Sequence, residues 1–213
     1  MRIISLILIL TSILYPLKLF SAEITVSADG EIKSISEAIN RASNGDKIIV
    51  RQGVYKEHLK INKTLTLIGI NRPEINGSGD GTIVRVNAPD VTIEGFSIKS
   101  TGSSLSREDC AIETDDSPGV IIRNNTMEDV LFGIYIKNSP GALISQNIIK
   151  GKDLPLPERG DGIRLWYSSE TRVTGNTLLN TRDLVIWWSS NTLIRENTVK
   201  NGRYGLHYMY SNH

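Results

Sequence analysis

Five segments of this chain can be written beneath one another so that their apolar residues fall at the same alternating positions. They are VTIEGFSIKS from Val91, VIIRNNTMED from Val120, ALISQNIIKG from Ala142, TRVTGNTLLN from Thr171 and TLIRENTVKN from Thr192. Successive segments start 29, 22, 29 and 21 residues apart. The two long steps carry the insertions TGSSLSRED and KDLPLPERGD, so the repeating unit is about 22 residues. A fixed period of this length indicates a repeat architecture.

Each unit has a second half that also aligns. The aligned segments are AIETDDSPG from Ala111, GIYIKNSPG from Gly133, GIRLWYSSE from Gly162, DLVIWWSSN from Asp183 and GLHYMYSNH from Gly205. Both halves alternate with period 2 and close on Ser, Asn, Pro or Gly, which predicts a short strand and a turn. A unit built only of short strands must bury its apolar face against its neighbours. The predicted fold class is therefore all-β, a right-handed parallel β-helix (a solenoid) with one unit per rung.

One position tests this register. It holds Phe96 in the first of these rungs and Asn125, Asn147, Asn176 and Asn197 in the next four. Rungs of a parallel coil lie about 4.8 Å apart, so stacked asparagines can hydrogen-bond along the stack. We interpret this column as structural and place none of its residues in a functional site.

The N-terminal part of the solenoid is different. In SISEAINRASNGDK, Ser34 and Glu37 have the spacing of a capping box, and the apolar residues after them have helical spacing. This predicts a short helix that covers the first open coil, with residues 23–90 as the cap and first coils and residues 91–213 as rungs. No such cap follows the last rung, so we expect the chain to be a fragment or a truncated reading frame whose C-terminal rungs and cap are missing.

Residues 1–22 have the features of a signal peptide. Arg2 precedes an apolar run from Ile3 to Tyr15, and the small residues Ser21 and Ala22 come after it. We therefore expect an exported protein. Removing Arg2 and Lys18 from 24 basic residues leaves 22 against 23 acidic residues. A balanced chain has no electrostatic drive toward nucleic acid, and no second apolar stretch predicts a membrane span. Cys110, the only cysteine, is either a small buried side chain or a soft metal ligand.

Alternation also assigns the outward-facing residues to columns. Taking Leu206 and Tyr208 among the inward residues gives three outward columns. These are Glu113, Tyr135, Arg164, Val185 and His207; then Asp115, Lys137, Trp166, Trp187 and Met209; and, at the turn, Asp116, Asn138, Tyr167, Trp188 and Tyr210. The wall changes from acidic to aromatic along the coil. We expect an exposed partner-binding strip of six residues: Tyr135, Trp166, Tyr167, Trp187, Trp188 and Tyr210. Stacking that only stiffens the sheet is the alternative.

His207 and Met209 lie two residues apart on one strand and are predicted to share a face. Imidazole and thioether together suit Cu(I) better than zinc or calcium. The pair is our candidate metal site, with copper as the ligand and His213 as a possible third donor. His58 is interpreted as a surface residue.

The blocks EDVLFGIYIKNSPG, RGDGIRLWYSSE and NGRYGLHYMYSN resemble the rung motifs of the NosD family. NosD proteins are periplasmic β-helix proteins of nitrous oxide reductase maturation. The resemblance implies a non-catalytic periplasmic partner of an ABC transporter, made of an ATPase and a permease. It also implies that a copper-carrying lipoprotein and nitrous oxide reductase are partners in assembly of the reductase's copper-sulfide centre.

Two other classes of function stay open. Exported β-helices often cleave acidic polysaccharides, which needs converging carboxylates with a basic residue nearby. Glu113, Asp115 and Asp116 supply acids on one rung, but Tyr135, Lys137 and Asn138 are predicted to lie over them. Asp115 and Lys137 are interpreted as an ion pair, and Asp161 as a turn residue. The remaining class is a metal-free module whose aromatic strip binds sugar rings or a protein.

Overall fold

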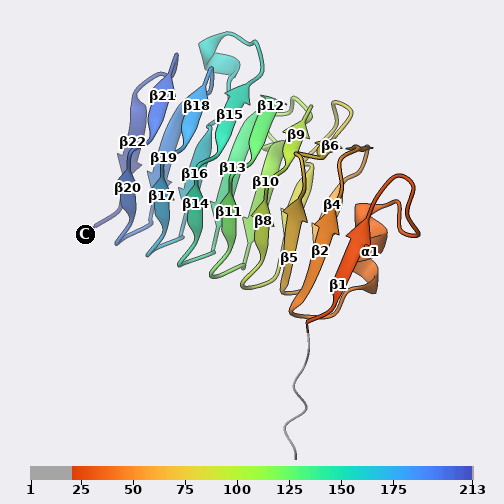
Figure 1. The fold of residues 1–213 in the computed structure, drawn as a ribbon. Coiled ribbons are helices and arrows are strands. Elements are labelled where there is room, and N and C mark those ends of the chain that lie inside the picture. Colours follow the sequence, from red (N-terminus) through yellow and green to blue (C-terminus); the bar gives the residue numbers. More distant parts are fainter. Residues whose placement is uncertain (1–20, 213) are drawn as a thin grey trace, which may run out of the picture.

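The computed structural model describes residues 21–212 and shows a right-handed parallel β-helix of about eight turns (Figure 1). The first turn contributes only β1 (Glu23–Val26), and each later turn contributes one short strand to each of three parallel sheets. The predicted fold class is confirmed. Apart from Ser21 and Ala22, the predicted signal peptide lies outside the described residues, as does His213. Within residues 21–212, no helix is long and apolar enough to cross a membrane.

The strands form three sheets, of which the first begins one turn before the other two. The first sheet contains β1 (Glu23–Val26), β2 (Asp46–Val50), β5 (Leu65–Gly69), β8 (Thr92–Glu94), β11 (Ile121–Arg123), β14 (Leu143–Ser145), β17 (Arg172–Thr174) and β20 (Leu193–Arg195). The second contains β3 (Val54–Tyr55), β6 (Glu74–Asn76), β9 (Ser97–Lys99), β12 (Thr126–Val130), β15 (Ile148–Gly151), β18 (Thr177–Leu179) and β21 (Thr198–Lys200). The third contains β4 (Leu59–Ile61), β7 (Val84–Val86), β10 (Cys110–Asp115), β13 (Phe132–Lys137), β16 (Ile163–Trp166), β19 (Asp183–Trp187) and β22 (Gly205–Met209).

The strand register matches the predicted repeat. Ile121 of β11 pairs with Leu143 of β14, which pairs with Arg172 of β17, and Arg172 pairs with Leu193 of β20. These pairings reproduce the unequal steps of the sequence, because both insertions lie outside the strands. The first insertion joins β9 to β10, and the second joins β15 to β16 and contains the 3₁₀ helix η1 (Leu156–Glu158).

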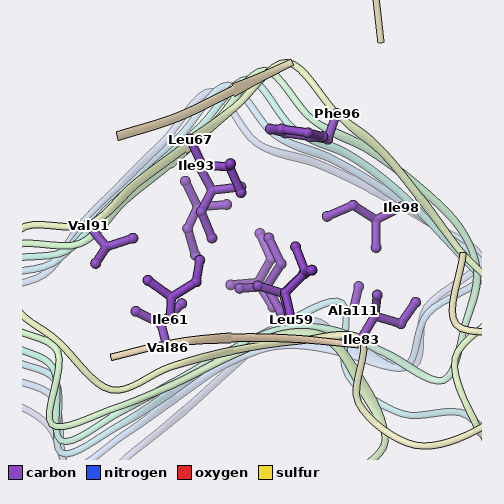
Figure 2. Packing of buried hydrophobic residues seen from close by; sticks show 14 of the residues in the cluster. Leu59, Ile61, Leu67, Ile83, Val86, Val91, Ile93, Phe96, Ile98 and Ala111 are labelled. Atoms are coloured by element: carbon purple, nitrogen blue, oxygen red, sulfur yellow. The ribbon is translucent and has the colours of Figure 1, made fainter. Parts of the chain in front are cut away.

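The core is a column of aliphatic side chains enclosed by the three sheets. Leu67 and Ile93 from the first sheet, Ile98 from the second and Leu59 from the third meet there, and all four are buried (Figure 2). Since each strand alternates, one side of it supplies this core and the other forms the outer wall. Leu206 and Tyr208 continue the inward column but are 48% and 42% exposed, because they belong to the last described coil.

The predicted cap is the helix α1 (Ile35–Arg41), which lies at the β1 end of the solenoid (Figure 1). Ser34 Oγ accepts a hydrogen bond from the backbone N–H of Glu37 at 3.2 Å, as the capping box predicts. The carboxylate of Glu57 accepts two further bonds, from the backbone N–H groups of Ile35 and Ser36 at 3.0 and 2.9 Å. This second cap comes from a distant turn and has no signal in the local sequence.

Two ladders of polar side chains form hydrogen bonds between neighbouring turns. In the predicted asparagine ladder, Asn125 Nδ2 donates to Asn147 Oδ1 at 3.1 Å, and Asn147 Nδ2 donates to Asn176 Oδ1 at 3.0 Å. A second ladder runs along the third sheet, where each serine hydroxyl accepts from the backbone N–H of the serine one coil earlier at 2.9 to 3.0 Å. Its members are Ser117, Ser139, Ser168, Ser189 and Ser211. The aligned serines in the sequence could have predicted it.

Candidate functional site on the outer face of the third sheet

The aromatic residues of the predicted strip lie on neighbouring strands of the third sheet. Trp166 of β16 pairs in register with Trp187 of β19, which pairs with Met209 of β22. The rings of Trp166 and Trp187 contact edge to face, with centroids 5.4 Å apart. The predicted column is therefore formed, and both tryptophans are partly exposed.

A second aromatic column lies at the turn. Tyr167, Trp188 and Tyr210 have φ angles of 48°, 45° and 51°, in the left-handed region. Tyr167 and Trp188 stack with centroids 5.4 Å apart, and Trp188 and Tyr210 stack with centroids 4.8 Å apart. Tyr167 and Tyr210 are 52% and 68% exposed. The strip therefore consists of Trp166, Tyr167, Trp187, Trp188 and Tyr210, and we call it the aromatic strip below.

Tyr135 does not belong to this strip, and its prediction as an exposed partner-binding residue is wrong. It is 5% exposed, and Val185 of the same column is 1% exposed. Tyr135 packs with Cys110, Leu131 and Phe132 in a small apolar cluster beneath Leu154 of the second insertion. Alternation places Tyr135 on the outside of the sheet correctly, but it cannot show that an insertion folds back over that side.

Arg164 holds both insertions against the sheet. Its Nε and Nη2 donate to Asp161 Oδ2 at 2.8 and 2.6 Å, and its Nη1 donates to Glu108 of the first insertion. The guanidinium also lies over the rings of Phe132 and Tyr135, 4.9 and 5.1 Å from their centroids. Asp161 is therefore more than a turn residue, since it is 4% exposed and ion-paired. Burial raises the pKa of Asp161, and Arg164 offsets this only in part.

Cys110 lies beneath the same two insertions. Its side chain is fully buried, and its thiol donates to the carbonyl oxygen of Glu108 at 2.8 Å. Burial raises the pKa of this thiol well above its ordinary value. Of the two interpretations of Cys110, a small buried side chain or a soft metal ligand, these observations match the first.

His207 and Met209 share the outer face of β22, as predicted. The Arg203 guanidinium donates to His207 Nδ1 at 3.2 Å, which leaves the ring proton on Nε2. Arg203 is itself held by Asp183, with Nη2 2.7 Å from Oδ2. Among residues 21–212 no group of three or more His, Cys, Asp and Glu side chains is arranged to hold a metal ion. Copper binding by His207 and Met209 stays a prediction.

The acidic end of the wall does not form a converging set. Glu113 pairs with Arg85, and Asp115 lies 3.4 Å from Lys137 Nζ. The predicted ion pair of Asp115 and Lys137 is thus present. His58 is exposed, as predicted, and its Nδ1 lies 2.9 Å from the carbonyl oxygen of Thr82.

The geometry agrees with what comparison with known proteins finds. The sequence profile described as "Right handed beta helix region" matches residues 32–178 and 82–213. The chain belongs to the right-handed β-helix family. Within it, the chain is similar to the "Probable ABC transporter binding protein NosD" of Pseudomonas aeruginosa, with 30% identity over 145 residues. That match covers 67% of this chain and 34% of the relative.

A second relative carries the same name. The NosD of Stutzerimonas stutzeri is 30% identical over 133 residues, which are 62% of this chain and 30% of the relative. The predicted resemblance to the NosD family is confirmed. The matched part spans about a third of the length of both relatives.

Solved β-helices share the architecture. Pectin methylesterase PemA from Erwinia chrysanthemi has a TM-score of 0.57 and 18% identity, covering 86% of this chain and 70% of that structure. At this identity the likeness shows the fold alone.

Proposed function

We propose that this β-helix is a periplasmic accessory protein of an ABC transporter, acting in assembly of the copper-sulfide centre of nitrous oxide reductase. The observation that carries the proposal is the 30% identity to two proteins named as ABC transporter binding proteins. The partners are then the transporter's ATPase and permease, a copper-carrying lipoprotein and the reductase. Copper is the cargo of this assembly, and His207 and Met209, at the β22 end of the aromatic strip, are the candidate residues that meet it.

The aromatic strip is the proposed docking face. It consists of three tryptophans and two tyrosines on three consecutive coils. Clusters of partly exposed aromatic side chains form the anchors of many protein interfaces. Tyr167 and Tyr210 present more than half of their surface to solvent. A protein partner can bury these ring edges without any rearrangement of the coil.

Sugar binding is less well supported by the same geometry. Sugar rings are recognised by stacking on the flat face of an aromatic ring. Here the faces of Trp188 are covered by Tyr167 on one side and Tyr210 on the other, with interplanar angles of 12° and 10°. The ladder therefore offers edges rather than faces along most of its length, which favours a protein partner.

The experiment is co-purification from the host of tagged protein with the transporter's ATPase and permease. The test variant replaces Tyr167, Trp188 and Tyr210 together by Asn, which tolerates left-handed turns. The matched control is Leu193→Asn, which removes a 49% exposed apolar side chain from the first sheet. We expect the transporter to be retained by wild type and control and lost from the triple variant. Equal retention by all three proteins would reject the aromatic strip as the docking face.

A further inference from the structure

A small pocket opens next to the aromatic strip, between the second insertion and the outer faces of β19 and β22. Its volume is about 110 Å³, and it is lined by Asp161, Arg164, Arg182, Val185, Trp187, Arg203 and His207. A cavity of roughly 10 to 15 Å³ already holds a water molecule, so the pocket has room for several heavy atoms. That is enough for a carboxylate and the carbon next to it.

Trp187 brings an unpaired hydrogen-bond donor to the wall of the pocket. The indole N–H of Trp187 is buried and has no partner within residues 21–212. Leaving a buried donor unpaired costs about 1 to 3 kcal/mol. Trp187 lines the pocket, while its N–H is buried behind that wall, so the indole senses a group bound in the pocket without contacting it through the N–H.

Arg182 supplies charge to the same wall. Its side chain is half-buried, and it forms no ion pair or hydrogen bond with the part of the chain that the structure describes. The other two arginines of the pocket are already held, Arg164 by Asp161 and Glu108, and Arg203 by Asp183. The charge of Arg182 acts on Asp161, where it opposes the rise in pKa that burial causes, but its guanidinium still has hydrogen bonds to donate to an anion.

His207 adds a donor of fixed orientation. Since the Arg203 guanidinium donates to Nδ1 of His207, Nε2 is the ring nitrogen that can donate, and His207 lines the pocket. Trp187 and His207 contact edge to face with centroids 5.7 Å apart. Guanidinium, indole and imidazole groups therefore line one small pocket.

We infer that this pocket is a receptor for a single carboxylate group, bound by Arg182 with the Nε2–H of His207 as the second donor and the Trp187 ring in the wall. The carboxylate comes either from a small free acid or from an acidic side chain of a docked protein. The inference concerns the chemistry of the pocket and does not depend on which protein the aromatic strip binds.

The test uses the purified full chain and monitors the three indole N–H signals of Trp166, Trp187 and Trp188 by NMR, assigned with Trp187→Phe. The probes are acetate, its neutral analogue acetamide, and phosphate, all at constant ionic strength. We expect acetate to shift the Trp187 signal saturably and acetamide to leave it in place. Arg182→Gln should weaken acetate binding at least about tenfold, the effect of losing one charge-assisted hydrogen bond.

Arg172→Gln is the matched control, because Arg172 is an exposed arginine of the first sheet that forms no ion pair with any described residue. Its acetate affinity should equal that of wild type. An unshifted Trp187 signal, an equal response to acetamide, tighter binding of phosphate than of acetate, or unchanged affinity in Arg182→Gln would each overturn the inference.

A blocked glutamyl peptide and its glutaminyl analogue identify the source of the carboxylate. Binding of the glutamyl peptide at least as tight as that of acetate, with none for the analogue, assigns the pocket to a partner's side chain. Acetate binding that exceeds peptide binding assigns it to a free acid. Both results support a carboxylate receptor. Neither depends on the copper content of the reductase, so the carboxylate pocket and the proposed function can be rejected independently of each other.

Discussion

The ring of Tyr210 stacks on that of Trp188 with centroids 4.8 Å apart and planes 10° apart, although both residues have left-handed backbone. Such backbone costs a bulky residue about 1 to 2 kcal/mol. A stacked aromatic pair returns about 0.5 to 1.5 kcal/mol. The cost for two residues exceeds the gain from one stack, so this stack does not by itself make the ladder a stabilising element. Docking, rather than stiffening, is the interpretation of the aromatic strip that this balance favours.

Trp188→Asn separates the two interpretations. Asn suits the left-handed turn, so the relief of strain should offset the lost stacking and the free energy of unfolding should change by less than about 1 kcal/mol. Loss of a tryptophan anchor should weaken partner binding by about 2 kcal/mol, or roughly 30-fold. Urea unfolding and a binding titration measure the two quantities. A stability loss above about 3 kcal/mol with unchanged binding would show that the ladder only stiffens the sheet.

The asparagine ladder predicts a gradient of mutational cost along the coil. Asn147 is fully buried, donates to Ile122 O and Asn176 Oδ1, and accepts from the backbone N–H of Asn125. Asn147→Ala leaves these groups unpaired and should lower the free energy of unfolding by about 3 kcal/mol or more. Asn197→Ala, at a partly exposed position, should cost about 1 kcal/mol, since water can replace the lost bonds. Equal costs in urea unfolding would contradict this.

The two insertions that bury Cys110 predict how fast its thiol reacts. Because the thiol is buried and its pKa is raised, we expect labelling of native protein by a thiol reagent to be slow. Arg164→Gln should speed labelling at least about tenfold, since it releases both insertions from the sheet. Lys137→Gln, which breaks a more exposed ion pair on the same sheet, is the control and should label like wild type. Labelling at one rate in all three proteins would reject the role of Arg164.

Burial of Tyr135 beneath the same insertions predicts how stability changes at alkaline pH. Burial raises the pKa of its phenol from 10.0 to about 12. The folded protein therefore holds this proton more tightly than the unfolded chain, and the free energy of unfolding falls as pH rises from about 10 to about 12. A spectrophotometric titration should show a late phenolate step that is absent in Tyr135→Phe. The same late step in both proteins would assign it to another tyrosine.

Features that depend on alternation alone were predictable from the sequence. The strand register, the asparagine ladder and the column of Trp166, Trp187 and Met209 all depend on a period that can be read directly from the residues. Each was found where the repeat places it.

The remaining features depend on contacts between segments far apart in the chain. Tyr135 is outward on its strand yet buried, because an insertion whose sequence carries no period folds over it. The local sequence around Asp161 indicates only a turn, whereas the structure shows its ion pair with Arg164. The indole N–H of Trp187 has no partner among residues 21–212, and this too is visible only when the neighbours of the ring are known.

The most direct test of the proposed function is the copper content of nitrous oxide reductase purified from a host that lacks the gene for this chain. We predict a reductase without its copper-sulfide centre and without turnover, restored by the wild-type gene but not by the triple variant of Tyr167, Trp188 and Tyr210. A fully loaded and active reductase from the deletion strain would contradict the proposed function.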